Sequence, residues 1–206
     1  MKVTDKITIT QEDNMELMAR YPDNYFDLAI VDPPYGMKKS STTGSGKLKH
    51  RALNKMNTDW DVAPNKEYFN ELFRVSKNQI IWGGNYFTLP PTRCVICWDK
   101  KQMMPTFLRW EMAWTSFYKP AKIFTYNNAD INKIHPTQKP VALYKWLLDK
   151  YAKQGDKILD THLGSGSIAI ACHDYGFELT ACELDKEYYD KAIERIQNHV
   201  AQQRLF

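Results

Sequence analysis

The feature that most limits the fold is a glycine-rich turn between an apolar strand pattern and an apolar helical pattern. It lies in residues 156–176, "DKILDTHLGSGSIAIACHDYG". Gly164 and Gly166 let the backbone approach a ligand, and the helix after them exposes its N-terminal amides. Glu183 ends the next strand pattern, 19 residues after Gly164, where a carboxylate can accept hydrogen bonds from two ribose hydroxyls. This stretch predicts a nucleotide or adenosyl site in a doubly wound fold.

The glycine turn is compatible with three interpretations. The spacing of Gly164, Gly166 and Ala169 satisfies the dinucleotide fingerprint GxGxxG/A, as in an NAD oxidoreductase. A plain strand-to-helix turn of any doubly wound fold would need no ligand. Asp160 favours a third interpretation, because a carboxylate at the strand end repels pyrophosphate and attracts a ligand with an ammonium and a sulfonium. S-adenosylmethionine (SAM) is such a ligand.

Strand and helix patterns alternate along the rest of the chain. The apolar spacing predicts helices at 65–77 and 140–153 and a closing helix at 186–203 with Asp185 as its N-cap. A short strand and a short helix are expected within residues 6–22. Further strands are expected at 26–31, 78–87, 93–100, 111–119, 122–127, 157–160 and 178–185. This βαβ spacing predicts one domain over residues 1–206, with a parallel or mixed sheet covered on both faces.

The composition fits a globular protein. The chain has 206 residues, 43% hydrophobic and 25% charged. It has no long apolar run and no apolar leader after Met1, so we expect a cytoplasmic protein without a membrane span. The cysteines lie in apolar surroundings and are expected to be reduced and buried, and they lack the second ligand pair of a zinc site, so no metal is expected. They are Cys94, Cys97, Cys172 and Cys182.

A second stretch, "AIVDPPYG" at residues 29–36, ends an apolar strand with an acid, two prolines and a tyrosine. An exocyclic amine of a nucleobase is a poor nucleophile, because its lone pair is conjugated with the ring. Asp32 and the carbonyl of Pro33 would accept hydrogen bonds from its N–H groups, in a turn stiffened by Pro33 and Pro34. Tyr35 would stack on a base flipped out of the duplex. The alternative is an ordinary proline turn.

A basic segment follows that turn directly. Residues 37–58 contain no acid and include "SSTTGSG", so a mobile loop is expected. An isolated loop of this kind would be a solvated surface loop, but its position after the proline turn favours a lid that faces a polyanion. Its basic residues are Lys38, Lys39, Lys47, Lys49, Arg51 and Lys55.

Together the motifs resemble the exocyclic amino DNA methyltransferases, in the beta group whose DPPY motif precedes the SAM-binding motif. "DPPYG" at 32–36 resembles their catalytic motif, "HPTQKP" at 135–140 the motif before the SAM strand, and "LDTHLGSGS" at 159–167 their glycine motif. The resemblance implies an α/β, Rossmann-like SAM-dependent methyltransferase fold, with a mostly parallel seven-stranded sheet, helices on both faces and an antiparallel edge hairpin. It implies cofactor-binding roles for His135, Thr137, Gln138, Lys139, Asp160, Leu163, Gly164, Ser165, Gly166 and Glu183.

The chain departs from that family at Thr161 and His162, where relatives usually have Pro-Phe. His162 either replaces the flat surface of the phenylalanine or adds a charge. The DPPY form goes mostly with adenine N6, so the resemblance implies adenine methylation in duplex DNA by base flipping and direct in-line transfer. Cytosine N4, more often linked to a Ser-Pro-Pro-Tyr form, is the alternative. Cytosine C5 chemistry needs a cysteine that usually follows a proline, and none of the four cysteines does.

Other readings leave more of the motifs unexplained. An RNA or protein amide methyltransferase usually carries Asn at the position of Asp32 and a different motif order. A non-catalytic DNA-binding module would have no need of the residues suited to methyl transfer. An NAD oxidoreductase would leave residues 32–35 and 135–140 without a role.

In relatives of this group the DNA sequence is read by a region that corresponds to residues 100–133, which is short here. Arg109, Lys119 and Lys122 are its expected DNA contacts, alongside the basic residues of 37–58, whereas Trp114 and Phe117 are expected in the core. Dimers are common in the group, so a homodimer stays an alternative to a single chain.

Overall fold

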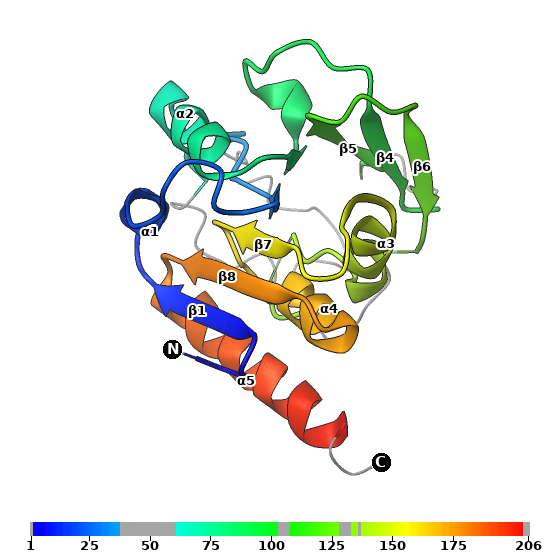
Figure 1. Ribbon diagram of the computed structural model, residues 1–206. Helices are drawn as coiled ribbons and strands as arrows, with labels where there is room; N and C mark the ends of the chain where they lie inside the picture. The colour runs from blue at the N-terminus through cyan, green and yellow to red at the C-terminus, as the bar shows by residue number, and fades with distance from the viewer. Residues whose placement is uncertain (1, 38–60, 103–107, 128–132, 136, 204–206) are drawn as a thin grey trace.

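Eight strands form one sheet in the order β1-β8-β7-β2-β3-β5-β4-β6 (Figure 1). The computed structural model describes residues 2–37, 61–102, 108–127, 133–135 and 137–203. The strands are β1 (Ile7–Gln11), β2 (Leu28–Val31), β3 (Gln79–Trp82), β4 (Val95–Asp99), β5 (Trp110–Thr115), β6 (Lys122–Thr125), β7 (Lys157–Asp160) and β8 (Glu178–Glu183). The helices are α1 (Asn14–Ala19), α2 (Lys66–Val75), α3 (Val141–Tyr151), α4 (Ser167–Tyr175) and α5 (Lys186–Gln203), with a 3₁₀ turn η2 at Gly84–Tyr86.

All strand pairs are parallel except those made by β5, which runs antiparallel to both β3 and β4. The carboxyl ends of the parallel strands therefore meet at one edge of the sheet, which we call the carboxyl edge; the opposite one is the amino edge. Open α/β sheets bind their ligands at the carboxyl edge. Asp32, Asp160 and Glu183 all lie at the carboxyl end of a parallel strand.

Two apolar cores cover the two faces of the sheet. Ile30 belongs to the core under α3, α4 and α5, which includes Leu147 and Ile170. Its neighbour Val31 belongs to the core under α1 and α2, which includes Leu72. Successive residues of a strand point to opposite faces of the sheet. Strand β2 is buried at all four positions and therefore contributes side chains to both cores.

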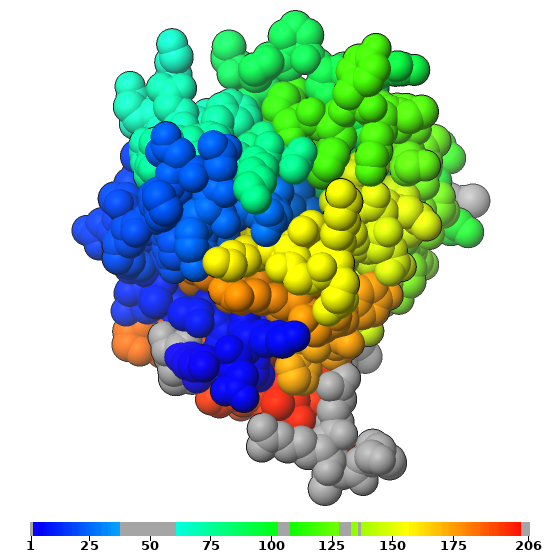
Figure 2. Space-filling model, viewed as in Figure 1, coloured from blue at the N-terminus to red at the C-terminus, as the bar shows by residue number. Residues whose placement is uncertain are grey.

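The N-terminal strand completes the sheet beside segments from the far end of the sequence. β1 pairs with β8, with Ile9 opposite Ala181. Figure 2 shows the N-terminal residues in blue next to the yellow and orange residues around β7 and β8. The predicted α/β fold with helices on both faces is confirmed, and its sheet is mostly parallel.

The sheet has eight strands, so the expected number of seven is wrong. The additional strand is β6, which pairs in parallel with β4 beyond the β4–β5 hairpin. The hairpin is therefore not at the edge of the sheet, and β5 is inserted between β3 and β4. Packing holds β6 in place, because the Phe124 ring lies 5.4 Å from the Trp146 ring of α3.

The helix predictions are confirmed at α2, α3 and α5. Asp185 caps α5, as its carboxylate accepts hydrogen bonds from the amides of Glu187 and Tyr188 at 2.8 and 3.0 Å. Cys94, Cys172 and Cys182 are buried thiols, and Cys97 is partly exposed. Among the described residues, no helix is long and apolar enough to cross a membrane.

Candidate active site

The glycine turn after β7 adopts a backbone that only glycine takes easily. Gly164 and Gly166 have φ angles of +53° and +73°, in the left-handed region that favours glycine. The Gly164 amide donates to Glu183 Oε2 at 2.8 Å, and the Asp185 amide donates to Glu183 Oε1 at 3.0 Å. A Cβ on Gly164 would meet nothing closer than the His135 ring at 3.9 Å, so this side of the turn is open. The turn and the acid are thus one rigid unit.

The charges around this turn fit SAM better than a dinucleotide. Asp160 is 2% exposed, and burial raises its pKa to about 8. Burial also raises the pKa of Glu183. A pyrophosphate would oppose the ionisation of both carboxyl groups, whereas a ligand that carries positive charge and hydroxyl donors would stabilise their ionised form. These two carboxyl groups therefore favour a ligand with a sulfonium and an ammonium over the phosphates of NAD.

His135 lies beside the glycine turn. The buried His135 ring faces Gly164 and packs on the Tyr188 ring at 4.3 Å. Burial and the nearby Lys139 lower the pKa of His135 to about 4, and its Nδ1 lies 3.0 Å from the Thr137 hydroxyl. Gln138 is buried and accepts the Ile134 amide at 3.1 Å. His135 and Gln138 therefore shape the segment beside the turn, whereas Thr137 is exposed.

Asp32 follows β2 at the carboxyl edge and is held at both carboxylate oxygens. The Tyr35 hydroxyl donates to Oδ1 at 2.8 Å, and the Lys139 ammonium contacts Oδ2. Lys139, for which the resemblance implies a cofactor-binding role, is thus paired with Asp32 in this structure. Pro33 is buried and Pro34 is partly buried, so the turn is packed rather than solvated.

The Tyr35 ring fits against the chain that follows β3. A Cβ on Gly83, whose φ is +68°, would lie 2.2 Å from this ring, so only glycine allows the ring to lie there. Tyr86 stacks on Tyr35 with centroids 4.9 Å apart and is 40% exposed. Tyr86 is an aromatic neighbour of the motif that sequence reasoning missed, although "GGNYF" was recognised as a strand end.

Sequence reasoning also missed Glu111 and Lys100. Glu111 lies on β5 and contacts the Lys139 ammonium at 3.2 Å through Oε2 and the Lys100 ammonium through Oε1. A charged residue at the start of an apolar strand, "WEMAWT", was the available signal. The residues that pair with Glu111, Lys100 and Lys139, lie outside β5, so the sequence of β5 alone does not predict these ion pairs.

Thr161 and His162 form a neutral polar cluster at the family's Pro-Phe position. His162 Nδ1 lies 3.0 Å from the Thr161 hydroxyl, and its Nε2 lies 3.2 Å from the Asn14 amide nitrogen. The Tyr68 hydroxyl lies 2.7 Å from that of Thr161. Burial lowers the pKa of His162 to about 3, so His162 adds a flat, uncharged ring rather than a charge.

Other predicted residues divide between structural and surface positions. Leu163 is buried in the core, and the Ser165 hydroxyl lies 3.1 Å from that of Ser167. Arg109 is exposed at the carboxyl edge, beside the first residue of β5. Lys119 and Lys122 lie at the amino edge, where the Lys119 ammonium donates to the carbonyl of Lys150 at 3.3 Å. Lys38, Lys39, Lys47, Lys49, Arg51 and Lys55 lie outside the described residues.

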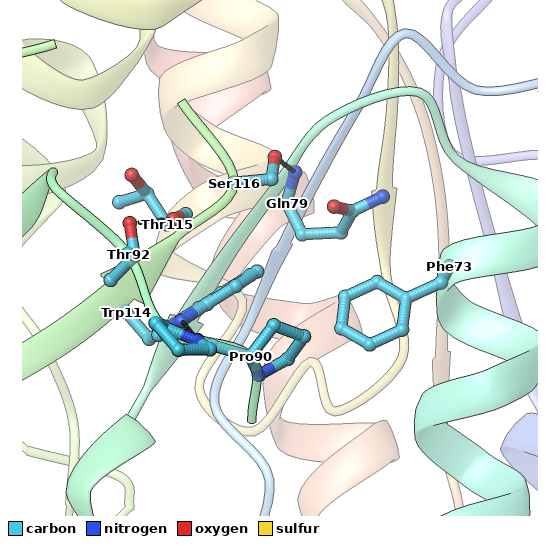
Figure 3. Close-up of a pocket in the computed structure, with 8 residues that line it drawn as sticks. Phe73, Gln79, Pro90, Thr92, Trp114, Thr115 and Ser116 are labelled. Atoms are coloured by element: carbon cyan, nitrogen blue, oxygen red, sulfur yellow. Dashed lines mark hydrogen bonds between the residues drawn. The ribbon is translucent and has the colours of Figure 1, made fainter. Parts of the chain in front are cut away.

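A cavity of about 320 Å³ opens at the amino edge and not at the motifs. Figure 3 shows it between Phe73 of α2 and the ends of β3 and β5. Its polar groups are paired internally, as in the bond from the Gln79 amide to the Ser116 hydroxyl at 2.9 Å. The core position expected for Trp114 is confirmed, since its indole N–H is bonded to the Pro90 carbonyl at 2.7 Å. This cavity holds none of the residues of the three motifs.

Comparison with known proteins identifies the family of the chain. The sequence model of a DNA methylase family of N6 and N4 enzymes matches residues 65–194. The Type II methyltransferase M.HpaI of Haemophilus parainfluenzae is 22% identical over 216 residues, 84% of this chain and 69% of that enzyme. The Type II methyltransferase M2.MboI of Moraxella bovis is 24% identical over 253 residues, 94% of this chain and 91% of that enzyme.

Solved structures share the fold at low sequence identity. The crystal structure of the M1.HpyAVI–SAM complex has a TM-score of 0.61 at 19% identity, covering 92% of this chain and 98% of that one. The cytosine-N4-specific PvuII DNA methyltransferase has a TM-score of 0.61 at 13% identity, covering 94% of this chain and 92% of that one.

Proposed function

This chain belongs to the N6 and N4 DNA methylase family, which uses SAM, and we propose that it methylates adenine N6 in duplex DNA. The observation that carries the proposal is the Asp-Pro-Pro-Tyr turn, with Asp32 fixed at both oxygens at the carboxyl edge that also bears the glycine turn. Cytosine N4 is the alternative acceptor, because the same pair of acceptors suits any exocyclic amine.

The geometry of the turn supports the proposed acceptor side of the reaction. We propose that a flipped base enters beside Tyr35 and that its amino group donates to Asp32 and to the Pro33 carbonyl. Two fixed acceptors favour a pyramidal nitrogen with a localised lone pair, and they need no reorganisation during the reaction. The aromatic pair Tyr35 and Tyr86 offers a face for stacking. The nitrogen would then bond to the methyl carbon while the sulfur of SAM leaves with the electron pair of the methyl–sulfur bond, and the amine would lose one proton to solvent.

The donor side is proposed to use the glycine turn. Bound SAM supplies a methyl group on a positively charged sulfur. Glu183 is suited to the ribose hydroxyls, since each of its oxygens accepts one backbone amide and keeps a further lone pair. Asp160 is suited to positive charge, and His135, Thr137 and Gln138 border the turn. Lys139 connects the two sides, because it lies in the SAM-side segment and contacts Asp32.

DNA is proposed to approach the carboxyl edge. Arg109 and the exposed side chains of Trp110 and Tyr126 lie there, a mixture that suits phosphates and bases. The Gly36 amide donates to Asp61 Oδ1 at 2.9 Å, so two residues that flank the basic segment in the sequence are in contact beside the DPPY turn. Residues 37–58 and the carboxyl-edge part of 100–133 are therefore the proposed DNA contacts, in preference to Lys119 and Lys122.

The test is methyl transfer from labelled SAM to mixed-sequence duplex DNA, followed by nucleoside analysis of the digest. We expect the label in N6-methyladenine. Label in N4-methylcytosine would be consistent with the proposed roles of Asp32 and Pro33 as acceptors, but it would show that the methylated base is cytosine and not adenine. Label in RNA or protein, with none in DNA, would overturn the proposed substrate. Reactions without the chain and without DNA are the controls.

A separate prediction concerns pH. Because the pKa of Asp160 is about 8 without ligand, most molecules hold a proton there at pH 7. We expect positive charge from SAM to lower this pKa, so that binding releases the proton and SAM affinity rises with pH. The dissociation constant should fall by up to about tenfold for each pH unit between 6 and 7.5. Calorimetry in buffers of different ionisation enthalpy measures the proton release.

The matched control for this prediction is Asp160→Asn, which keeps the side-chain shape and cannot ionise. Its SAM affinity should be weaker and nearly independent of pH over the same range. If affinity for the wild-type chain is equally flat and no proton is released, Asp160 does not face the cationic part of SAM.

A further inference from the structure

A line of alternating charges leads from the DPPY turn into the sheet. Asp32 contacts the Lys139 ammonium, Lys139 contacts Glu111 at 3.2 Å, and Glu111 contacts the Lys100 ammonium. The side chains are only 2–17% exposed. Although burial opposes ionisation, the two ammonium groups hold the pKa of Glu111 below its usual value. Asp32 and Glu111 likewise raise the pKa of Lys139 against the effect of burial.

Fold stability does not by itself account for this line. The desolvation of buried charges offsets most of their attraction, and a well-packed apolar replacement is often as stable. Glu111 occupies β5, in the interior of the sheet, opposite Trp98 of β4. An apolar side chain would suit that position. The line of charges ends on the residue proposed to hold the reacting amine, which points to a role in the reaction.

The aromatic side chains beside the line leave the lysines little freedom. The Lys139 ammonium lies 5.1 Å from the Trp82 ring, and the Lys100 ammonium lies 5.0 Å from the Trp98 ring. The two indoles pack edge to face at 6.4 Å. The Trp82 indole N–H is buried without a hydrogen-bond partner among the described residues, and as a donor it cannot accept from an ammonium group. Among the described residues, Glu111 is therefore the second carboxylate, besides Asp32, that contacts the Lys139 ammonium.

We propose that Glu111 is a positioning residue for methyl transfer, which holds Lys139 against Asp32 and thereby fixes the plane of the Asp32 carboxylate. Tyr35 anchors one carboxylate oxygen and Lys139 anchors the other. The remaining lone pairs of Asp32 then point where the amine must donate. Glu111 touches neither the base nor SAM in this account. The inference rests on the proposed role of Asp32 as an acceptor.

The first test is Glu111→Gln, which keeps the size of the side chain and removes its charge. We expect kcat for DNA methylation to fall by about 10–100-fold, the effect of weakening a hydrogen bond between charged groups. The KM for DNA and the dissociation constant for SAM should stay within about threefold of wild type. Glu111→Asp should recover part of kcat. The matched control is Glu71→Gln, which breaks the Glu71–Arg74 pair on α2 and should leave kcat unchanged.

The second test separates positioning from a merely structural role by pH. Lys139→Met removes the cation between Asp32 and Glu111, so two carboxylates face each other and one holds a proton to higher pH. The acidic limb of the kcat profile should move to higher pH by at least one unit. In the double variant Lys139→Met with Glu111→Gln, the limb should return toward the wild-type position although kcat stays low.

The outcomes distinguish the inference from the proposed function. An active wild-type chain whose Glu111→Gln variant keeps full kcat would overturn the role of Glu111. Losses in the melting temperature of every variant, without any movement of the pH profile, would also overturn it and leave a structural role. A wild-type chain that methylates no DNA, with SAM bound, would instead overturn the proposed function.

Discussion

Asp32→Ala is expected to abolish methyl transfer while SAM binding stays within a few fold of wild type. The substitution removes the proposed acceptor for the amino group, and the loss of one preorganised group of this kind costs about 10²–10³ in kcat. SAM binding should survive because the Glu183 carboxylate is held by the amides of Gly164 and Asp185 and not by Asp32. Labelled transfer to DNA measures the first quantity, and calorimetric SAM titration measures the second.

The fold of this variant should also survive. Lys139 keeps Glu111 as a partner at 3.2 Å, so no buried cation is left alone, and thermal unfolding checks this point. Asp32→Asn retains one oxygen acceptor and should keep more activity than the alanine variant. Methyl transfer by Asp32→Ala at more than about a tenth of the wild-type rate would refute the acceptor role.

The parts of the site that the sequence predicted well are those written in one continuous stretch. The glycine turn and Glu183 follow from a strand, two glycines and the end of the next strand, because parallel neighbours bring their carboxyl ends together. The core side of α3 is likewise predicted by its spacing, with Tyr144, Leu147 and Leu148 buried. Such features need only local pattern and the rule that joins successive parallel strands.

The features that the sequence did not reveal depend on register between segments far apart in the chain. The place of Glu111 beside Lys139 requires β5 to insert between β3 and β4 in one register, with Trp98 opposite Glu111. The cofactor role expected for Lys139 came from the family resemblance and from its charge, whereas its two carboxylate partners, Asp32 after β2 and Glu111 on β5, come from distant segments. The strand at "KIFT" was expected from its residues, but its place in the sheet beside β4 was not, because it depends on the same long-range pairing.

Thr161 and His162 stand where relatives usually have Pro-Phe, and residues distant in the sequence supply their hydrogen-bond partners. A histidine at the position of the family's phenylalanine would add a positive charge to the site if its imidazole were protonated. Asn14 and Tyr68, from α1 and α2, complete a hydrogen-bonded cluster around His162 and Thr161. Burial then keeps the imidazole neutral. Both ring nitrogens of His162 therefore have polar partners within this cluster.

Glu183→Ala is expected to weaken SAM binding by about 10–100-fold, with a smaller effect on kcat at saturating SAM. The carboxylate is the proposed acceptor for ribose hydroxyls, and hydrogen bonds to a charged group contribute about 1.5–3 kcal/mol each. The variant also leaves the amides of Gly164 and Asp185 without their side-chain acceptor. Titration calorimetry with SAM measures the affinity, and thermal unfolding reports damage to the turn.

Two comparison variants separate the ligand role of Glu183 from its structural role. Glu183→Gln keeps an oxygen for the Gly164 amide and loses the charge, so it should unfold near the wild-type temperature and still bind SAM more weakly. Glu178→Ala removes an exposed carboxylate from the first position of the same strand, at the amino edge, and should bind SAM normally. Wild-type affinity in Glu183→Gln would mean that this acid only holds the glycine turn, and the ribose would need another acceptor at the carboxyl edge.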